Sequence, residues 1–287
     1  MTLGSADRYV RRVLALLSLG LCSWGALGVP APLRGEEPAD AKLKKLADDA
    51  RERARGMEVK FGERGKKAAL HADPLIKYTD VPRQIEMATL WLWHDDGRPV
   101  ALGKVEAYPG KDGPSWLYCF ASASSELVET KWADGHEFQA RKAGIEWTAL
   151  EGPAPKDTAA ARLRQMKELF GRFSTKTHDD ILKISDELRP LARPLHEYSA
   201  PKQGVVQGVL FGFAANGTNP DVVVALEAVS GPDNKDVAKT WRFGVIGMTA
   251  SGIVVKLDKT EVYTRPYTNK PMNYDNWTYF RENPPKK

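Results

Sequence analysis

The chain has 287 residues, of which 42% are hydrophobic, enough for a buried core without disulfide support. Its formal net charge of +5 is spread along the chain, and in segment 42–55 basic side chains share a predicted helix with acidic ones. This mixed pattern is typical of a solvated helix face, whereas nucleic-acid binding requires a basic patch, so we expect no nucleic-acid partner.

The N-terminus has the pattern of a secretory signal peptide over residues 1–31. Three arginines precede the uncharged stretch 13–29, and small residues and prolines follow. Cleavage after Gly28 and cleavage after Ala31 both fit. We predict a secreted or periplasmic protein with no membrane span after cleavage. Because the uncharged stretch is close to the length of a membrane span, an uncleaved anchor is the alternative.

A linker, 32–39, leads into a first unit predicted over 40–150. Apolar residues spaced three and four apart from Asp40 to Arg55 indicate an amphipathic helix that packs one face on a sheet. The hydrophobic period then changes to two, and Gly-containing turns separate the segments. Strands are expected at residues 58–61, 75–79, 86–93, 99–108, 116–123, 126–132, 137–141 and 144–150.

The segment Leu90-Trp91-Leu92-Trp93 is apolar on both faces of its predicted strand. An antiparallel strand with one wet face should alternate, so this strand is expected to be covered on both sides. We expect the helix on one face and a second sheet, or the other unit, on the opposite face.

A second linker, 151–156, precedes a second unit predicted over 157–266, and an aromatic tail, 267–287, follows it. Asp157 or Thr158 is expected to cap the helix of this unit. Extended segments are expected at residues 178–188, 194–198, 205–213, 221–229, 241–246, 252–257 and 261–264.

The second unit repeats the first at a shift of about 120 residues, which indicates internal duplication. Pro74-Leu75-Ile76-Lys77-Tyr78 returns as Pro194-Leu195-His196-Glu197-Tyr198, and Gly97 returns as Gly217. We therefore predict an α+β fold of two duplicated units, each an N-terminal helix followed by an antiparallel β-meander.

The order of signal, helix, Pro-Leu-x-x-Tyr, aromatic strand, Asp-Gly turn and Trp-x-Tyr strand resembles a group of uncharacterised secreted bacterial proteins with an internal duplication. The resemblance covers most of the mature chain and implies no activity. By element order alone, a helix followed by a meander also resembles cystatin-like and NTF2-like domains, a likeness that does not fix function.

The sequence contains none of the common nucleophile, metal or phosphate motifs. The triplets His94-Asp95-Asp96 and His178-Asp179-Asp180 supply metal-ligand types, but the sequence nominates no third ligand for either. We expect neither a metal nor a cofactor. Cys119 is left alone once Cys22 departs with the signal peptide, and its apolar neighbours favour a place in a strand core.

Glu106 and Glu227 occupy matching places near strand ends. If a pseudo-twofold axis relates the units, the two carboxylates could meet in a cleft and perform acid–base chemistry. The competing interpretation is a structural hydrogen bond or ion pair, repeated by duplication. Trp91 and Trp93 are candidates for an apolar ligand groove, although tryptophans at matched positions are more often core residues.

Three functions follow from these observations. We favour a binding or envelope-associated protein without catalysis, whose partner is a cell-envelope component or a small ligand. The main alternative is a hydrolase-like enzyme with a cleft between the units, using Glu106 and Glu227. The third is a structural partner protein with an exposed sheet edge.

Overall fold

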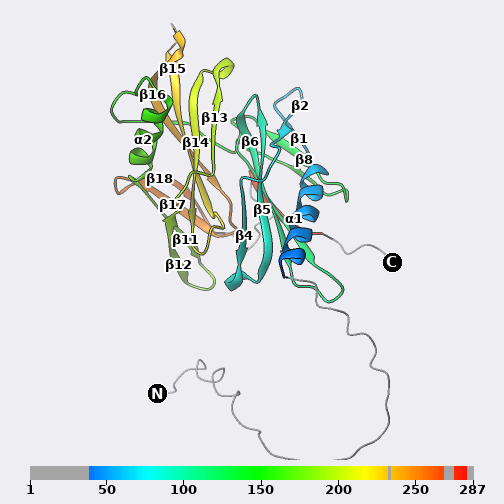
Figure 1. Ribbon diagram of the computed structural model, residues 1–287. Coiled ribbons are helices and arrows are strands. Elements are labelled where there is room, and N and C mark those ends of the chain that lie inside the picture. The colour runs from blue at the N-terminus through cyan, green and yellow to red at the C-terminus, as the bar shows by residue number, and fades with distance from the viewer. Residues whose placement is uncertain (1–38, 232–233, 268–274, 283–287) are drawn as a thin grey trace, which may run out of the picture. The chain divides into compact units, whose positions relative to one another are not determined.

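The computed structural model describes residues 39–231, 234–267 and 275–282 (Figure 1). All of these described residues belong to one compact unit. The predicted signal peptide, 1–31, lies outside the described residues, as do nearly all of the linker 32–39 and parts of the tail.

The elements of the first half are α1 (Ala39–Arg55), β1 (Glu58–Phe61), β2 (Lys66–Lys67), β3 (Ala69–Leu70), β4 (Ile76–Asp80), the 3-10 helix η1 (Val81–Arg83), β5 (Ile85–Asp95), β6 (Arg98–Tyr108), β7 (Ser115–Ser122), β8 (Val128–Lys131), β9 (Glu137–Gln139) and β10 (Thr148–Leu150). Those of the second half are α2 (Ala159–Phe170), β11 (Phe173–Asp179), β12 (Ile184–Pro190), β13 (His196–Ala200), η2 (Pro201–Gln203), β14 (Val205–Ala214), β15 (Val222–Gly231), β16 (Asn234–Gly247), β17 (Gly252–Leu257) and β18 (Thr260–Arg265). In the tail, β19 (Trp277–Arg281) pairs with β7 of the first half.

The prediction of an α+β fold made of two helix-plus-meander units is wrong. The described chain is mostly β, with antiparallel sheets of four, six and nine strands that include a half-barrel, and two α-helices accompany them. In a meander each strand pairs with the next, but β8 returns to pair with β1, and β17 returns to pair with β11. Turn residues mark only local hairpins, so these long-range pairings leave no pattern in the sequence.

Each helix covers one face of a sheet (Figure 1). α1 buries Leu46 and Ala50 in a core shared with β5 and β6, and α2 buries Met166 and Leu169 in a core shared with β14 and β15. Thr158 caps α2, and it is one of the two residues predicted to do so. Its Oγ1 accepts a hydrogen bond from the backbone N–H of Ala161. Packing of these apolar faces, at about 1.5–3 kcal/mol for each fully buried large side chain, holds the helices in place.

The central strand β5 is buried on both faces, which confirms the expectation drawn from its sequence. Trp91 and Trp93 belong to the core beneath α1, whereas Leu90 and Leu92 belong to a separate core that contains residues of the second half. Alternation of side chains along the strand sends neighbours to opposite faces. The residues that the second half contributes to this shared core include Leu210, Val223 and Ala225.

Two matching polar contacts join the halves at the rim of this shared core. At the end of η1, Arg83 Nη2 donates to Asp221 Oδ1 at 3.1 Å. At the end of η2, Gln203 Nε2 donates to Asp95 Oδ2 at 3.2 Å. Arg83 and Gln203 occupy matching positions of the repeat, so each half presents the same short helix to a hairpin of the other.

The predicted continuous extension over 178–188 is wrong, because a turn interrupts it. β11 ends at Asp179 and β12 begins at Ile184. The turn contains no glycine; Lys183 adopts a left-handed φ of 56° instead. A turn built on a lysine in this conformation lacks the usual sequence signal.

Among the described residues, no helix combines the length and apolar character that a membrane crossing requires.

Candidate functional site

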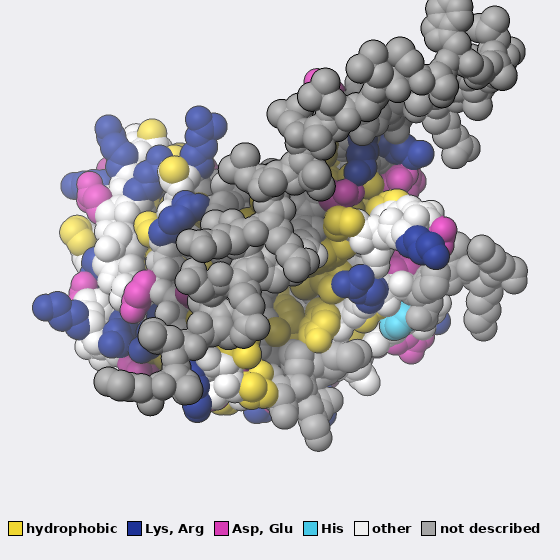
Figure 2. All heavy atoms as spheres, turned by 90° about the horizontal axis from the view of Figure 1, so that it is seen from below, with side chains coloured by type: hydrophobic (Ala, Val, Ile, Leu, Met, Phe, Trp, Pro, Cys, Tyr) yellow, Lys and Arg dark blue, Asp and Glu magenta, His cyan; other side chains and the backbone are white. Residues whose placement is uncertain are grey.

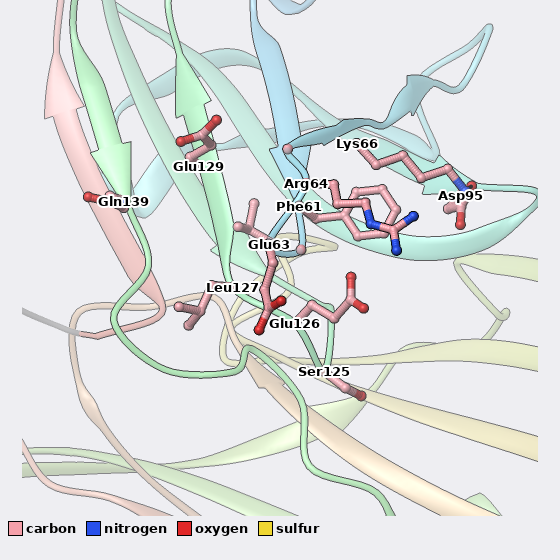
Figure 3. A pocket seen from close by; sticks show the side chains of 13 residues that line it. Phe61, Glu63, Arg64, Lys66, Asp95, Ser125, Glu126, Leu127, Glu129 and Gln139 are labelled. Carbon is pink, nitrogen blue, oxygen red and sulfur yellow. Dashed lines mark ion pairs between the residues drawn. The ribbon is translucent and has the colours of Figure 1, made fainter.

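The candidate site is a groove beside the sheet of β1, β2, β8 and β9 (Figure 3). Its larger part has a volume of about 900 Å³, and a smaller part of about 340 Å³ adjoins it. Phe61, Asp95, Ser125 and Glu126 line both parts, so the two are named together the β1–β8 groove. A groove of this volume is in the range of small-ligand sites.

Glycines shape the turn that forms one wall of the groove. Gly62 and Gly65, between β1 and β2, have φ values of 71° and 59°. The amide of Gly62 donates to the carbonyl of Leu127 at 2.9 Å, which ties this turn to the segment before β8. A Cβ at position 62 would lie 2.5 Å from Glu126 Oε2. The flexible Glu126 side chain could move away from such a Cβ, so it is the left-handed backbone conformation that requires glycine here.

The lining of the larger part carries more acidic than basic side chains. Lys66 Nζ is bound to Asp95 Oδ1 at 2.6 Å, which neutralises that lysine. Figure 3 shows Glu63 and Glu126 reaching into the space between the β1–β2 turn and the segment before β8. Among the described residues, neither of these two carboxylates forms an ion pair. Arg64 adds a single further cation to the wall.

The smaller part of the groove lies against a buried charge cluster. Trp147, Arg98 and Gln203 line it. The guanidinium carbons of Arg98 and Arg242 lie 5.1 and 4.7 Å from the Trp147 ring centroid, within the range of cation–π attraction. Both arginines also bind Glu227: Arg98 Nε donates to Oε1 at 3.0 Å, and Arg242 Nε donates to Oε2 at 2.6 Å. Glu227 is therefore connected to the groove through the side chain of Arg98.

Glu106 and Glu227 are buried, and each has its own set of partners. Glu106 accepts hydrogen bonds from the hydroxyls of Tyr78 at 3.1 Å and Tyr108 at 2.9 Å. Glu227 accepts one from Tyr198 at 3.0 Å in addition to the two arginines. Burial, followed by the adjacent carboxylate, raises the pKa of Tyr78 and of Tyr198 well above the ordinary value, so both donate as neutral phenols. Neither glutamate lines the β1–β8 groove.

Trp91 and Trp93 are each 1% exposed in the core beneath α1, so neither ring is accessible to a ligand. Trp91 Nε1 donates to Thr89 Oγ1 at 2.8 Å inside that core. The aromatic side chains that line the groove are Phe61 and Trp147 instead.

The metal-like triplets have other contacts in the structure. Among the described residues, no group of three or more His, Cys, Asp or Glu side chains is arranged to hold a metal ion. Asp95 binds Lys66, and Asp179 Oδ1 accepts backbone N–H groups of the turn that follows it. Burial raises the pKa of the Cys119 thiol well above its usual range, so this thiol stays protonated at neutral pH.

Three histidines gather where the halves meet. The ring of His71 lies edge-on to His196 at 5.0 Å and to His94 at 6.3 Å, centroid to centroid. Burial, followed by the charge of His71 and then of His94, lowers the pKa of His196 to about 4. Burial and then His71 also lower the pKa of His94, against the opposing effect of Asp95 and Asp96.

The groove residues were not anticipated from the sequence. Gly62 and Gly65 could have indicated a tight turn after β1, because both glycines flank a charged pair. Nothing local marks Glu126 or Trp147, because the segments before β8 and β10 reach the groove through long-range pairings that the sequence pattern does not show. Arg98 follows a predicted hairpin turn, but no local signal shows that it lines a groove.

Comparison of the chain with protein-family models, with curated proteins and with solved structures finds no significant match.

Proposed function

We propose that the protein is a secreted binding protein without catalysis that holds a small, positively charged ligand in the β1–β8 groove. The observation that carries this proposal is the lining of the groove. Leu127 is 53% exposed there, beside the carboxylates of Glu63 and Glu126. An exposed leucine next to acidic groups without cationic partners suits a ligand with a charged end and an apolar part.

Electrostatics favours a cation over an anion. A ligand ammonium about 4 Å from one carboxylate gains about 1 kcal/mol in water-like surroundings, and a second carboxylate adds to this. Glu129 on β8 contributes a third acidic side chain to the lining. An anionic ligand would meet these groups with Arg64 alone to compensate, since Lys66 is already bound to Asp95.

The buried positions of Glu106 and Glu227, the residues that the enzyme alternative would use, also support a binding role. Glu106 and Glu227 are buried and saturated by tyrosines and arginines. A general acid or base has to come within hydrogen-bond reach of its substrate. Their environment suits the structural interpretation of the repeated carboxylate.

The test is calorimetric titration of the full chain with putrescine, spermidine and trilysine, and with a neutral oligosaccharide as the contrasting class. We expect the cationic probes to bind, more weakly as salt is raised. Glu63→Gln and Glu126→Gln should each lower affinity about fivefold, the equivalent of about 1 kcal/mol. Asp112→Asn removes an exposed carboxylate that does not line the groove, and should leave affinity unchanged. Binding of the neutral probe alone, or equal effects of all three variants, would refute the proposal.

Export has a separate test. N-terminal sequencing of protein recovered from outside the cytoplasm should begin at Val29 or Pro32, which follow the two predicted cleavage sites. Recovery of an intact N-terminus would instead support the uncleaved anchor.

A further inference from the structure

Large exposed aliphatic side chains gather at the turn between β11 and β12. Ile181, Leu182 and Ile184 are 61%, 65% and 48% exposed. Residues 179–184 are named here the β11–β12 tip. In Figure 1 these two strands lie at the lower end of the molecule, the side from which Figure 2 views it.

The β11–β12 tip is held by contacts within its own turn, and Asp179 also hydrogen-bonds the side chain of Tyr267. Asp179 Oδ1 accepts the amide N–H groups of Ile181 and Leu182, both at 2.9 Å. Lys183 closes the turn with its left-handed φ of 56°. Two amides that would otherwise need water are thus satisfied internally, which lowers the cost of moving this turn into an apolar environment.

The matching turn of the first half is polar. Phe61 and Lys66 close the β1–β2 turn, and Asp179 and Ile184 close the β11–β12 turn, each around four residues. Gly65 and Lys183 take the same left-handed place, so Arg64 corresponds to Leu182. The same turn lines a charged groove in one half and presents bare aliphatic side chains in the other.

We infer that the β11–β12 tip inserts into a lipid surface. The tip is small and ends a hairpin, whereas a stable protein interface covers about 800 Å² on each partner. Lipid chains adapt to a few protruding side chains and supply no hydrogen-bond partners, which suits a turn whose amides are satisfied by Asp179. This inference does not depend on the groove or its ligand.

The charges around the tip favour neutral lipid. Asp180 and Lys183 lie in the turn, and Asp186 and Glu187 follow on β12. Lys176 on β11 and Lys256 on the neighbouring strand β17 supply positive charge. Acidic groups outnumber basic ones nearest the tip, so anionic headgroups would be repelled, while Lys183 can extend its ammonium toward the phosphates of a zwitterionic lipid.

The first test is sedimentation of the full chain with phosphatidylcholine vesicles, and with vesicles that also contain phosphatidylserine. We expect binding to the neutral vesicles that added phosphatidylserine weakens. The double variant Ile181→Ser, Leu182→Ser should lower the partition coefficient at least tenfold, because each side chain loses most of its apolar transfer energy. Unchanged partition of this variant would overturn the inference. So would binding only to anionic vesicles, or a chain that self-associates through these residues without binding lipid.

Leu127→Ser is the matched control, since it removes an exposed leucine of the groove and not of the tip. It should weaken groove ligands and leave vesicle binding unchanged, while the tip variant should do the reverse. The two proposals can therefore fail separately.

A second measurement uses the duplicated turn. An environment-sensitive dye attached through Leu182→Cys should shift to blue emission on neutral vesicles, while the same dye attached through Arg64→Cys, at the matching position, should not. Equal responses at the two positions would contradict insertion by the β11–β12 tip.

Discussion

Glu106 and Glu227 are the same carboxylate of the repeat in two different environments. Each accepts a hydrogen bond from the tyrosine at the matching place on β4 or β13, Tyr78 or Tyr198. In the first half another tyrosine completes the environment of the carboxylate, whereas in the second half two arginines do. One of these, Arg98, comes from the first half. Glu227 thus takes part in the contact between the two halves, whereas Glu106 forms its hydrogen bonds within the first half.

The largest expected effect is a loss of folding stability on substitution of Glu227, which should exceed the loss on substitution of Glu106. Glu227→Gln should lower the free energy of unfolding by about 3–5 kcal/mol, because it leaves two partly buried guanidinium groups facing an amide. Glu106→Gln should cost only about 1 kcal/mol, since an amide can still pair with two tyrosine hydroxyls. Urea unfolding of both variants measures the difference. Equal losses would mean that the arginines add nothing to the second site.

The next effect concerns the matched glycines Gly97 and Gly217, at the turns that touch the other half. Gly97 has a φ of 91°, and a Cβ there would lie 2.7 Å from the carbonyl oxygen of Ser199. Gly217 has a φ of 52°, and its Cβ would lie 3.6 Å from the carbonyl of Thr79, an ordinary contact. Gly97→Ala should therefore cost about 2–3 kcal/mol and Gly217→Ala about 1 kcal/mol, in thermal or urea unfolding. The reverse order would show that the two turns are not held as the structure places them.

Acidification should lower the stability of the protein through His196 and His94, which lie where the two halves meet. Their folded pKa values lie below that of unfolded histidine, about 6.5, so the unfolded chain binds more protons between that pH and about 4. Because both rings are partly exposed, stability should fall by only about 1 kcal/mol as pH drops through this window. His196→Asn should flatten the dependence there. A pH dependence that this variant leaves unchanged would contradict the assignment.

The smallest effect is expected for Lys202→Ala, which removes an exposed ion pair between η2 and the β5–β6 turn. Lys202 Nζ lies 2.8 Å from Asp96 Oδ2, and the lysine side chain is 83% exposed. The loss should be the smallest of those predicted here and should vanish at high salt. A loss as large as that of Gly97→Ala would show that the exposed polar contacts between the halves contribute as much as their buried contacts.

Local features followed from the sequence because they depend on short-range physics. The Asp96-Gly97 turn, the Thr158 cap and the double-sided burial of β5 each follow from backbone preference or side-chain period within a few residues. The turn at 180–183 was missed because a lysine, and not a glycine, takes the left-handed conformation. The meander was wrong for a different reason. β8 and β17 pair across about 70 to 80 residues of chain, where no periodicity reaches.

The sequence by itself determined the repeat, the helices, most hairpins and the identity of the repeated carboxylates. Only the tertiary structure decided that Glu227 would meet Arg98, that Glu63 and Glu126 would face an open groove, and that Ile181 and Leu182 would face solvent. The physical reason is that propensity and periodicity act along the chain, whereas burial and charge pairing depend on which surfaces meet. Two copies of one pattern can therefore share their elements and still present a charged groove in one half and an apolar tip in the other.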